Sequence, residues 1–299
     1  MVSATANNKK ESANGFVRFL KRTFGVTASD IVFNVILYVF VIAFLVIMLL
    51  PFVYVICESF KSRKLVDGVP TEIWSFAAYA KVLENESIFR AYINTFFTTI
   101  SGTLLAVALT TIGSYPLSRK SLVGRQAFIV YVLITMLFSG GLIPFYILIR
   151  NVLQLTDSYF VYIIIGATGA FNIFIVKGYF QGIPEELYEF RIFFSIYLPL
   201  SKPIIATVAL WVAVGKWNDY LTGLLYINSS EKLLIQNVLR GMLSKVSSSS
   251  GIGGDSSLQA LAESTKMATV VISIIPIMLV YPFDQKYFTK GVMLGSVKG

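Results

Sequence analysis

Six long apolar runs dominate this sequence and decide what kind of protein it can form. A helix needs about 20 predominantly apolar residues to cross a bilayer, and each run reaches or approaches that length. Of the 299 residues, 56% are hydrophobic and only 14% are charged, which is typical of integral membrane proteins. Backbone groups in lipid must be satisfied within the segment, so we predict an all-α protein with six transmembrane helices. The predicted spans are Ile31–Cys57, Ala91–Leu117, Ala127–Ile149, Phe160–Phe180, Pro203–Ile227 and Met267–Phe283.

The distribution of Lys and Arg predicts the topology, because cytoplasmic flanks of membrane spans are enriched in both. Basic residues such as Lys9, Lys10 and Arg18 precede the first run, so the tail of residues 1–29 is predicted to be cytoplasmic. With six spans across a membrane domain of residues 30–285, the tail of residues 286–299 is cytoplasmic as well. External loops then fall near residues 58–90 and 228–266, and the Ser- and Gly-rich segment Val246–Ser257 is predicted to be flexible.

Residue types that are missing exclude several classes of function. The chain has no histidine and a single cysteine, Cys57, so it lacks the usual metal ligands, Ser-His pairs and any internal disulfide. The pair Gly215-Lys216 lacks the rest of a phosphate-binding loop, so ATP binding by such a loop is excluded. We therefore predict no catalytic residues and no metal site. The net charge of +9 is assigned to flanks that meet anionic lipid, and no aromatic-basic groove indicates nucleic acid.

An acidic segment, GIPEELYEF at residues 182–190, separates the fourth and fifth runs. Pro184 suits the first position of a helix, and Glu185 and Glu186 suit its positive N-terminal end. Apolar residues then recur at helical spacing, which predicts a short amphipathic helix in a cytoplasmic segment near residues 181–194. Such a helix could lie among lipid headgroups or dock a cytoplasmic partner. Its acidic residues would be repelled by an anionic leaflet, so they favour docking to a partner.

A polar cluster interrupts the fifth run. Charged groups at this depth are costly and usually face a protein interior or an aqueous path. Trp217 and Tyr220 offer faces for sugar rings, while Asn218 and Asp219 offer hydrogen bonds to hydroxyls. The alternative is a polar packing seam in which Lys216 pairs with Asp219, three residues further along the helix. The candidate residues of the substrate path are Lys216, Trp217, Asn218, Asp219 and Tyr220.

Glycines interrupt the third run at Ser139-Gly140-Gly141, which is followed by Pro144. Irregular backbone within a membrane is tolerated only where protein or a cavity surrounds it. We predict a break in the third span, and favour a kink for close helix contact over a ligand-binding carbonyl.

Several of these stretches together resemble a known family. FRIFFSIYLPLSKPIIATVALWVAV at residues 190–214, preceded by GIPEEL, is similar to permease subunits of binding-protein-dependent ABC importers of the maltose type. MLFSGGLIPFYILI at 136–149, GKWNDY at 215–220 and YPFDQKYFTKGVMLGSVKG at 281–299 resemble the oligosaccharide subfamily labelled polysaccharide- or lipoprotein-type C subunits. The resemblance runs from about residue 27 to the end.

The resemblance implies a type I importer permease fold in a bacterial cytoplasmic membrane and an oligosaccharide substrate. It implies three kinds of protein partner: a homologous second permease, a dimer of ATPases that binds ATP and Mg, and an extracytoplasmic solute-binding protein. In this family, the connection before the fifth span is a coupling helix that sits in a cleft of the ATPase. The coupling residues implied here are Ile183, Pro184, Glu185, Glu186, Leu187, Tyr188, Glu189 and Phe190.

The chain departs from its family within this coupling segment. The family continues with approximately E-A-A-x-x-D-G-A, whereas here Glu189 is followed directly by Phe190 and Arg191. We expect a shortened segment that still docks through Pro184–Glu189, and the alternative is a chain with impaired coupling.

Two other functions remain as alternatives to sugar import. One is an ABC permease for amino acids or phosphate, which would have similar spans. The other is a polytopic membrane enzyme, but without histidine its candidate groups shrink to the carboxylates of Glu185, Glu186 and Glu189. Association with an ATPase distinguishes a permease from an enzyme.

Overall fold

The computed structural model describes residues 28–66, 69–183, 193–249, 263–279 and 282. The chain divides into two compact units, residues 1–58 and 59–299. The described part of the first unit is α2 (Ala28–Ser59) up to Glu58, a nearly uniformly apolar helix that is long enough to cross a membrane. The first predicted span is therefore one continuous helix.

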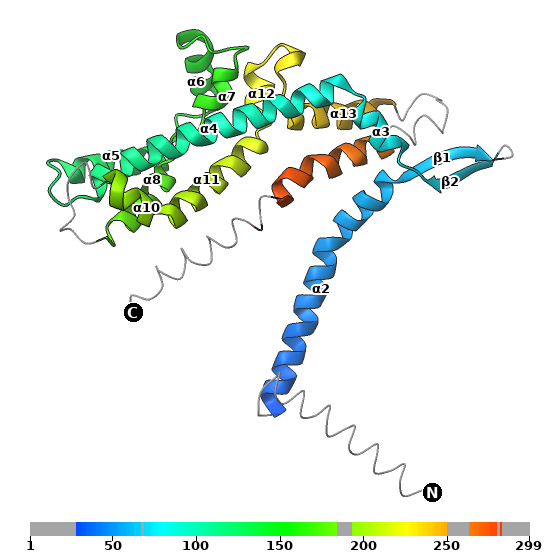
Figure 1. The fold of residues 1–299 in the computed structure, drawn as a ribbon, viewed down its shortest axis with the longest axis horizontal. Helices are drawn as coiled ribbons and strands as arrows, with labels where there is room; N and C mark the ends of the chain where they lie inside the picture. The colour runs from blue at the N-terminus through cyan, green and yellow to red at the C-terminus, as the bar shows by residue number, and fades with distance from the viewer. Residues whose placement is uncertain (1–27, 67–68, 184–192, 250–262, 280–281, 283–299) are drawn as a thin grey trace, which may run out of the picture. The chain divides into compact units, whose positions relative to one another are not determined.

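The second unit is mostly helical, as predicted, but it opens with a β-hairpin in the first predicted external loop, which the all-α prediction did not include. β1 (Lys61–Val66) pairs antiparallel with β2 (Val69–Trp74), with Lys61 opposite Trp74 and Val66 opposite Val69. Strands of six residues are too short to appear in a scan for long apolar runs. The helix α3 (Ala77–Leu83) follows the hairpin (Figure 1).

The central helix of the second unit is α4 (Glu86–Ser118), which packs against six other α-helices of the described residues. Its 33 residues extend for about 50 Å at 1.5 Å per residue. The helix begins after Asn85, whose side chain accepts hydrogen bonds from the backbone N–H groups of Ser87 and Ile88. Buried Thr and Ser residues line much of its length, and several donate to a backbone carbonyl one turn earlier, as Thr95 does to Ala91 (2.7 Å). Small and hydroxyl-bearing side chains of this kind permit close packing of membrane helices.

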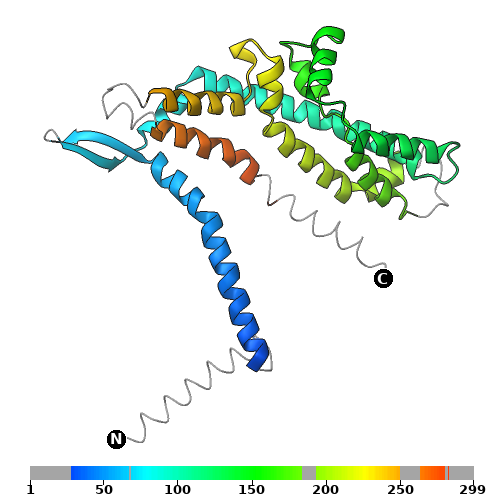
Figure 2. The same cartoon turned by 180° about the vertical axis from the view of Figure 1, so that it is seen from behind.

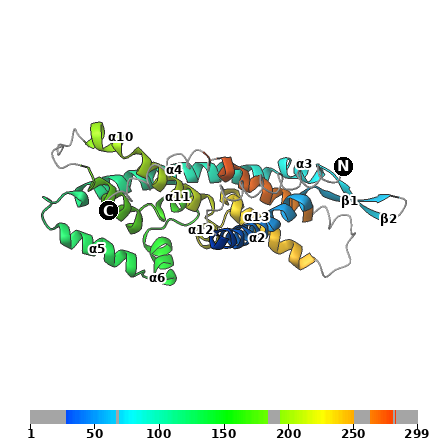
Figure 3. The same cartoon turned by 90° about the horizontal axis from the view of Figure 1, so that it is seen from below.

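The third predicted span is broken, as expected. The helix α5 (Arg125–Leu137) ends before the Ser-Gly-Gly sequence, and α6 (Leu142–Ile147) continues into a π-helical turn, η1 (Leu148–Val152). The two parts meet at an angle of 104° (Figure 3). Gly141 adopts φ +86°, a conformation that favours glycine, which explains why the break lies there.

The fourth and fifth predicted spans are also discontinuous. The fourth consists of α7 (Tyr159–Ile164) and α8 (Ala170–Phe180). After η2 (Phe193–Tyr197) and α10 (Leu198–Leu200), the fifth consists of α11 (Lys202–Trp217) and α12 (Leu221–Tyr226). Within the described residues, two helices are long and apolar enough to cross a membrane, or three if the bent pair counts as one span. Six spans therefore remain a prediction.

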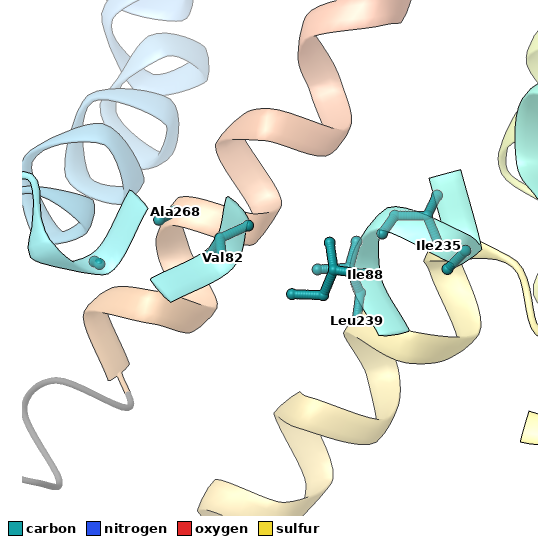
Figure 4. Close-up of a cluster of buried hydrophobic side chains, with 7 residues drawn as sticks. Val82, Ile88, Ile235, Leu239 and Ala268 are labelled. Atoms are coloured by element: carbon teal, nitrogen blue, oxygen red, sulfur yellow. The ribbon is translucent and has the colours of Figure 1, made fainter. Parts of the chain in front are cut away.

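The second predicted external loop contains regular structure. A short 3-10 turn, η3 (Ser230–Lys232), leads into α13 (Ile235–Ser249), and residues 263–279 form a further helix. The segment Val246–Ser257 was predicted to be flexible, and this is wrong for its first four residues, which belong to α13. Ile235 and Leu239, one helical turn apart, are buried in a cluster with Val82, Ile88 and Ala268 (Figure 4).

A polar link between two loops fixes where α12 ends and α13 begins. The carboxylate of Asp157 accepts hydrogen bonds from the hydroxyl (2.6 Å) and backbone N–H (3.0 Å) of Ser229. It also forms an ion pair with the Lys232 ammonium at 3.1 Å. These bonds hold the pKa of the Asp157 carboxyl well below its usual range, with the Ser229 hydroxyl as the largest cause. The loop before α7 is thereby tied to the loop after α12.

We expect Asp157→Asn to lower the melting temperature of the detergent-solubilised subunit at pH 7. Asparagine tolerates the φ of +55° at this position, so the variant leaves the backbone unstrained and removes the charge together with one accepting oxygen. Because folding lowers this pKa, its stabilising effect is present above the unfolded value of about 3.9 and is lost as the pH falls. The difference from wild type should therefore narrow below about pH 4. Glu84→Gln, on an exposed carboxylate, is the control, and a difference that does not change with pH would contradict this account.

Candidate functional site

The polar cluster predicted in the fifth span lies where α11 ends. Lys216 is 7% exposed, and its ammonium donates to three backbone carbonyls at the end of α7, those of Tyr162, Ile163 (3.3 Å) and Ile165 (2.5 Å). The last carbonyls of a helix have no partners within it, and in a membrane they cannot be satisfied by lipid. Lys216 therefore caps the broken fourth span.

Gly102 of α4 makes room for this lysine. A Cβ atom at that position would lie 3.0 Å from Lys216 Cε, closer than ordinary packing allows. The predicted ion pair between Lys216 and Asp219 is wrong, because the ammonium is bound to carbonyls. Asp219 instead accepts a hydrogen bond from the backbone N–H of Thr222 at the start of α12 (3.1 Å).

Trp217 is also turned into the protein. It is 4% exposed, its indole N–H donates to the carbonyl of Ser273 (3.2 Å), and its ring packs edge-on against Phe96 at a centroid distance of 5.0 Å. It lines an apolar cavity of about 220 Å³ between α4, α11 and the helix of residues 263–279. Among the five predicted path residues, Lys216 and Trp217 thus have structural contacts within the subunit.

Asn218 and Tyr220 have the accessibility that a ligand needs. Both line a cavity of about 460 Å³ formed by the end of α11, α13 and the helix of residues 263–279, which are seen from behind in Figure 2. Its size falls in the usual range for small-molecule sites, about 300–1,000 Å³. The cavity lining consists of Asn218, Tyr220, Gln236, Leu239, Arg240, Val270, Ser273, Ile274 and Ile277.

A second cavity, of about 380 Å³, shares Tyr220 and Arg240 with the first. The guanidinium of Arg240 lies 4.5 Å from the centroid of the Tyr220 ring. Asn237, which lines the second cavity, donates to the Tyr220 carbonyl (2.9 Å) and packs tightly on Gly223 of α12. These contacts hold α13 against the end of the fifth predicted span.

The helix α13 was not among the elements predicted to form this site. A signal was present, because Ile235, Val238, Leu239 and Met242 recur at the spacing of one helix face. This pattern would have predicted an amphipathic helix with Gln236 and Arg240 on another face. Its contact with residues near position 220 could not be read from spacing.

The predicted coupling segment is described at its two ends only. Ile183 is 7% exposed and belongs to a buried cluster with Phe180 of α8, Phe193 and Tyr197 of η2 and Val208 of α11. The remaining coupling residues, Pro184, Glu185, Glu186, Leu187, Tyr188, Glu189 and Phe190, lie outside the described residues.

Comparison with known proteins identifies the family, although no protein-family model matches the chain. The chain is 41% identical to the polygalacturonan/rhamnogalacturonan transport system permease protein YtcP of Bacillus subtilis (strain 168), over 89% of this chain and 98% of the relative. It is 38% identical to protein LplC of the same organism, over 85% of this chain and 90% of the relative. The maltodextrin transport system permease protein MdxG, also of this organism, is 28% identical, over 76% of this chain and 81% of the relative.

A solved structure agrees with these relatives. The fold is similar to a chain in the crystal structure of a bacterial ABC transporter involved in the import of the acidic polysaccharide alginate, with a TM-score of 0.76 and 29% identity. The similarity covers 88% of this chain and 98% of the other. Together with the 41% identity to a permease over nearly its whole length, this shows that the chain belongs to the carbohydrate ABC transporter permeases.

Proposed function

We propose that this chain is a permease subunit of an ATP-driven importer of oligosaccharides and forms half of its translocation path. The observation that supports this most strongly is the 41% identity to a polygalacturonan/rhamnogalacturonan permease over 98% of that protein. The cavity at the end of α11 adds support, because amide side chains and an aromatic ring are the groups that bind sugar hydroxyls and ring faces. Asn218 and Tyr220 are the proposed path residues, with Asp219 holding the turn between them and α12.

The proposed topology has six spans in a bacterial cytoplasmic membrane, with both termini in the cytoplasm. Discontinuous helices are compatible with this topology, since non-helical backbone is tolerated at membrane depth where it is buried in protein or lines a cavity. At the break in the fourth predicted span, the Lys216 ammonium accordingly satisfies the backbone carbonyls of Tyr162, Ile163 and Ile165. The Asp157 link and the hairpin then lie on the outer side.

The proposed partners are a homologous second permease, a dimer of ATPases and an extracytoplasmic solute-binding protein. The ATPases would bind ATP and Mg and perform hydrolysis, while this chain would hold neither. The proposed lever between the ATPases and this chain is the segment Ile183–Phe190. Its first residue, Ile183, and Phe193, which follows it in the chain, belong to one buried cluster.

A shortened coupling segment fits the length of the alignment with the polygalacturonan relative. That alignment extends over 286 positions but takes up only 89% of this 299-residue chain, so the relative has residues without a counterpart here. We place part of this difference after Glu189, where the family's E-A-A-x-x-D-G-A residues are lacking.

Reconstitution tests the proposed function. The chain should co-purify with an ATPase encoded with it or supplied from the same cell, and vesicles containing both permeases and the ATPase should accumulate oligosaccharides only with ATP and a binding protein. Vesicles that contain this chain alone should accumulate none. Accumulation by the chain alone, or failure to associate with any ATPase, would contradict the proposal.

A further inference from the structure

We infer that Arg240 selects saccharides that carry a carboxylate, so that the importer takes up acidic, uronate-bearing oligosaccharides. This inference rests on the proposed function and adds to it the chemical class of the substrate and the residue that recognises it.

Arg240 gives the cavity its charge. Among the described residues that line the two adjoining cavities, it is the single charged side chain, and no Asp or Glu is included. The other polar side chains of the larger cavity are the neutral groups of Asn218, Tyr220, Gln236 and Ser273. An anionic ligand would therefore meet an attractive charge there, whereas a cationic ligand would be repelled.

The guanidinium of Arg240 is positioned but not neutralised. It lies over the Tyr220 ring at 4.5 Å, and no carboxylate of the described residues forms an ion pair with it. Contact with the ring forms no hydrogen bond with the guanidinium N–H groups, which remain available to a ligand. A carboxylate can accept two parallel hydrogen bonds from this planar fork, which is the strongest pairing that arginine makes with an anion.

The neighbouring amides complete a site for a sugar acid. Gln236 Nε2 donates to Asn218 Oδ1 at 3.3 Å across the cavity, so the two amides face each other beside Arg240. Amides both donate and accept, as sugar hydroxyls do. A uronate residue presents a carboxylate and several hydroxyls on one ring, which matches one guanidinium beside two amides.

The test compares charged and esterified ligands that have the same hydroxyls. Vesicles with the assembled importer, its binding protein and ATP are given a mixture of uronic-acid trisaccharides (galacturonate, mannuronate and guluronate), their methyl esters and neutral trisaccharides, and uptake is read by mass spectrometry. We expect the wild type to accumulate an acidic trisaccharide. Arg240→Gln should lower the uptake rate of the acidic trisaccharide, relative to the uptake rate of its ester or of the neutral sugar, by about tenfold or more. This is the size expected for loss of a bidentate ionic contact. The wild-type and Arg240→Gln importers are supplied with the same binding protein. The preference of that protein therefore cancels when the two ratios of acidic to neutral uptake are compared.

Arg150→Gln is the matched control, because Arg150 also lies over a tyrosine ring, that of Tyr146, but lines neither cavity. It should leave the ratio unchanged. Arg240→Lys, which retains the charge without the fork, should fall between wild type and Arg240→Gln. Uptake of neutral sugars alone, or an unchanged ratio in Arg240→Gln, would overturn the inference and leave the proposed function standing. Failure to accumulate any sugar with the ATPase assembled would overturn both.

Discussion

Replacing Lys216 by Met is expected to destabilise the subunit by about 2 to 4 kcal/mol and to lower its yield in the assembled importer. Methionine keeps most of the apolar stem and removes the ammonium, so the change isolates the hydrogen bonds to the carbonyls of α7. A buried acceptor without a partner costs about 1 to 3 kcal/mol. The Lys216 ammonium donates to the carbonyls of Tyr162, Ile163 and Ile165, so the substitution removes a hydrogen-bond donor from all three.

The size of this effect follows from the place of the break. The fourth predicted span has five residues between α7 and α8, so its backbone is irregular inside an otherwise apolar run. Within a bilayer neither lipid nor bulk water can serve carbonyls freed by such a break. A long cationic side chain from the fifth span is therefore a structural requirement of the fourth.

Thermal unfolding of the detergent-solubilised subunit measures the loss, with Lys202→Met as the control at an exposed lysine of the same helix. Gly102→Ala is a second variant of the same contact, because the added Cβ would lie 3.0 Å from Lys216 Cε and should push this side chain by a few tenths of an ångström, which strains its hydrogen bonds. We expect both variants to be less stable than the control. If Lys216→Met unfolds at the wild-type temperature, the capping role is wrong.

The sequence was informative where a feature lies within one run. The length of α2 and of α4 follows from apolar content, and the break at Gly141 follows from glycines that permit φ +86°. The breaks after Ile164 and Trp217 were not predicted, because apolar content does not report a change of backbone direction. Gly166, with φ +74°, was the available signal for the first of them.

The features that could not be predicted from the sequence depend on contacts between residues that are distant in the chain. The carbonyl partners of Lys216 lie more than fifty positions earlier in the chain, so a local rule favoured Asp219 as its partner. Arg240 joins Tyr220 only because α13 folds back on α12 through the tight contact of Asn237 with Gly223. The family was recognisable from motifs, whereas the cavity depends on this packing.

Replacing residues 184–189 by a Gly-Ser sequence of equal length is expected to abolish ATP-driven uptake. The physical reason lies in the flanks of the segment. Phe193 packs against Tyr115 of α4 at a centroid distance of 4.6 Å, and Ile183 and Val208 belong to the same buried cluster. A force applied between Ile183 and Phe193 therefore reaches α4, α8 and α11 through close-packed side chains, which are barely compressible.

A coupling element can shift the permease only if the ATPase grips it differently in its two states. Gly-Ser removes the side chains to be gripped and makes the connection flexible, while the buried cluster that holds its ends is retained. The subunit should accordingly still fold and insert, but ATP hydrolysis should no longer drive sugar accumulation. The same replacement at residues 250–255, a stretch already rich in Ser and Gly, is the control and should leave uptake unchanged. Undiminished accumulation by the 184–189 variant would mean that force enters this permease elsewhere, and that the residues lacking after Glu189 mark a contact the importer does not use.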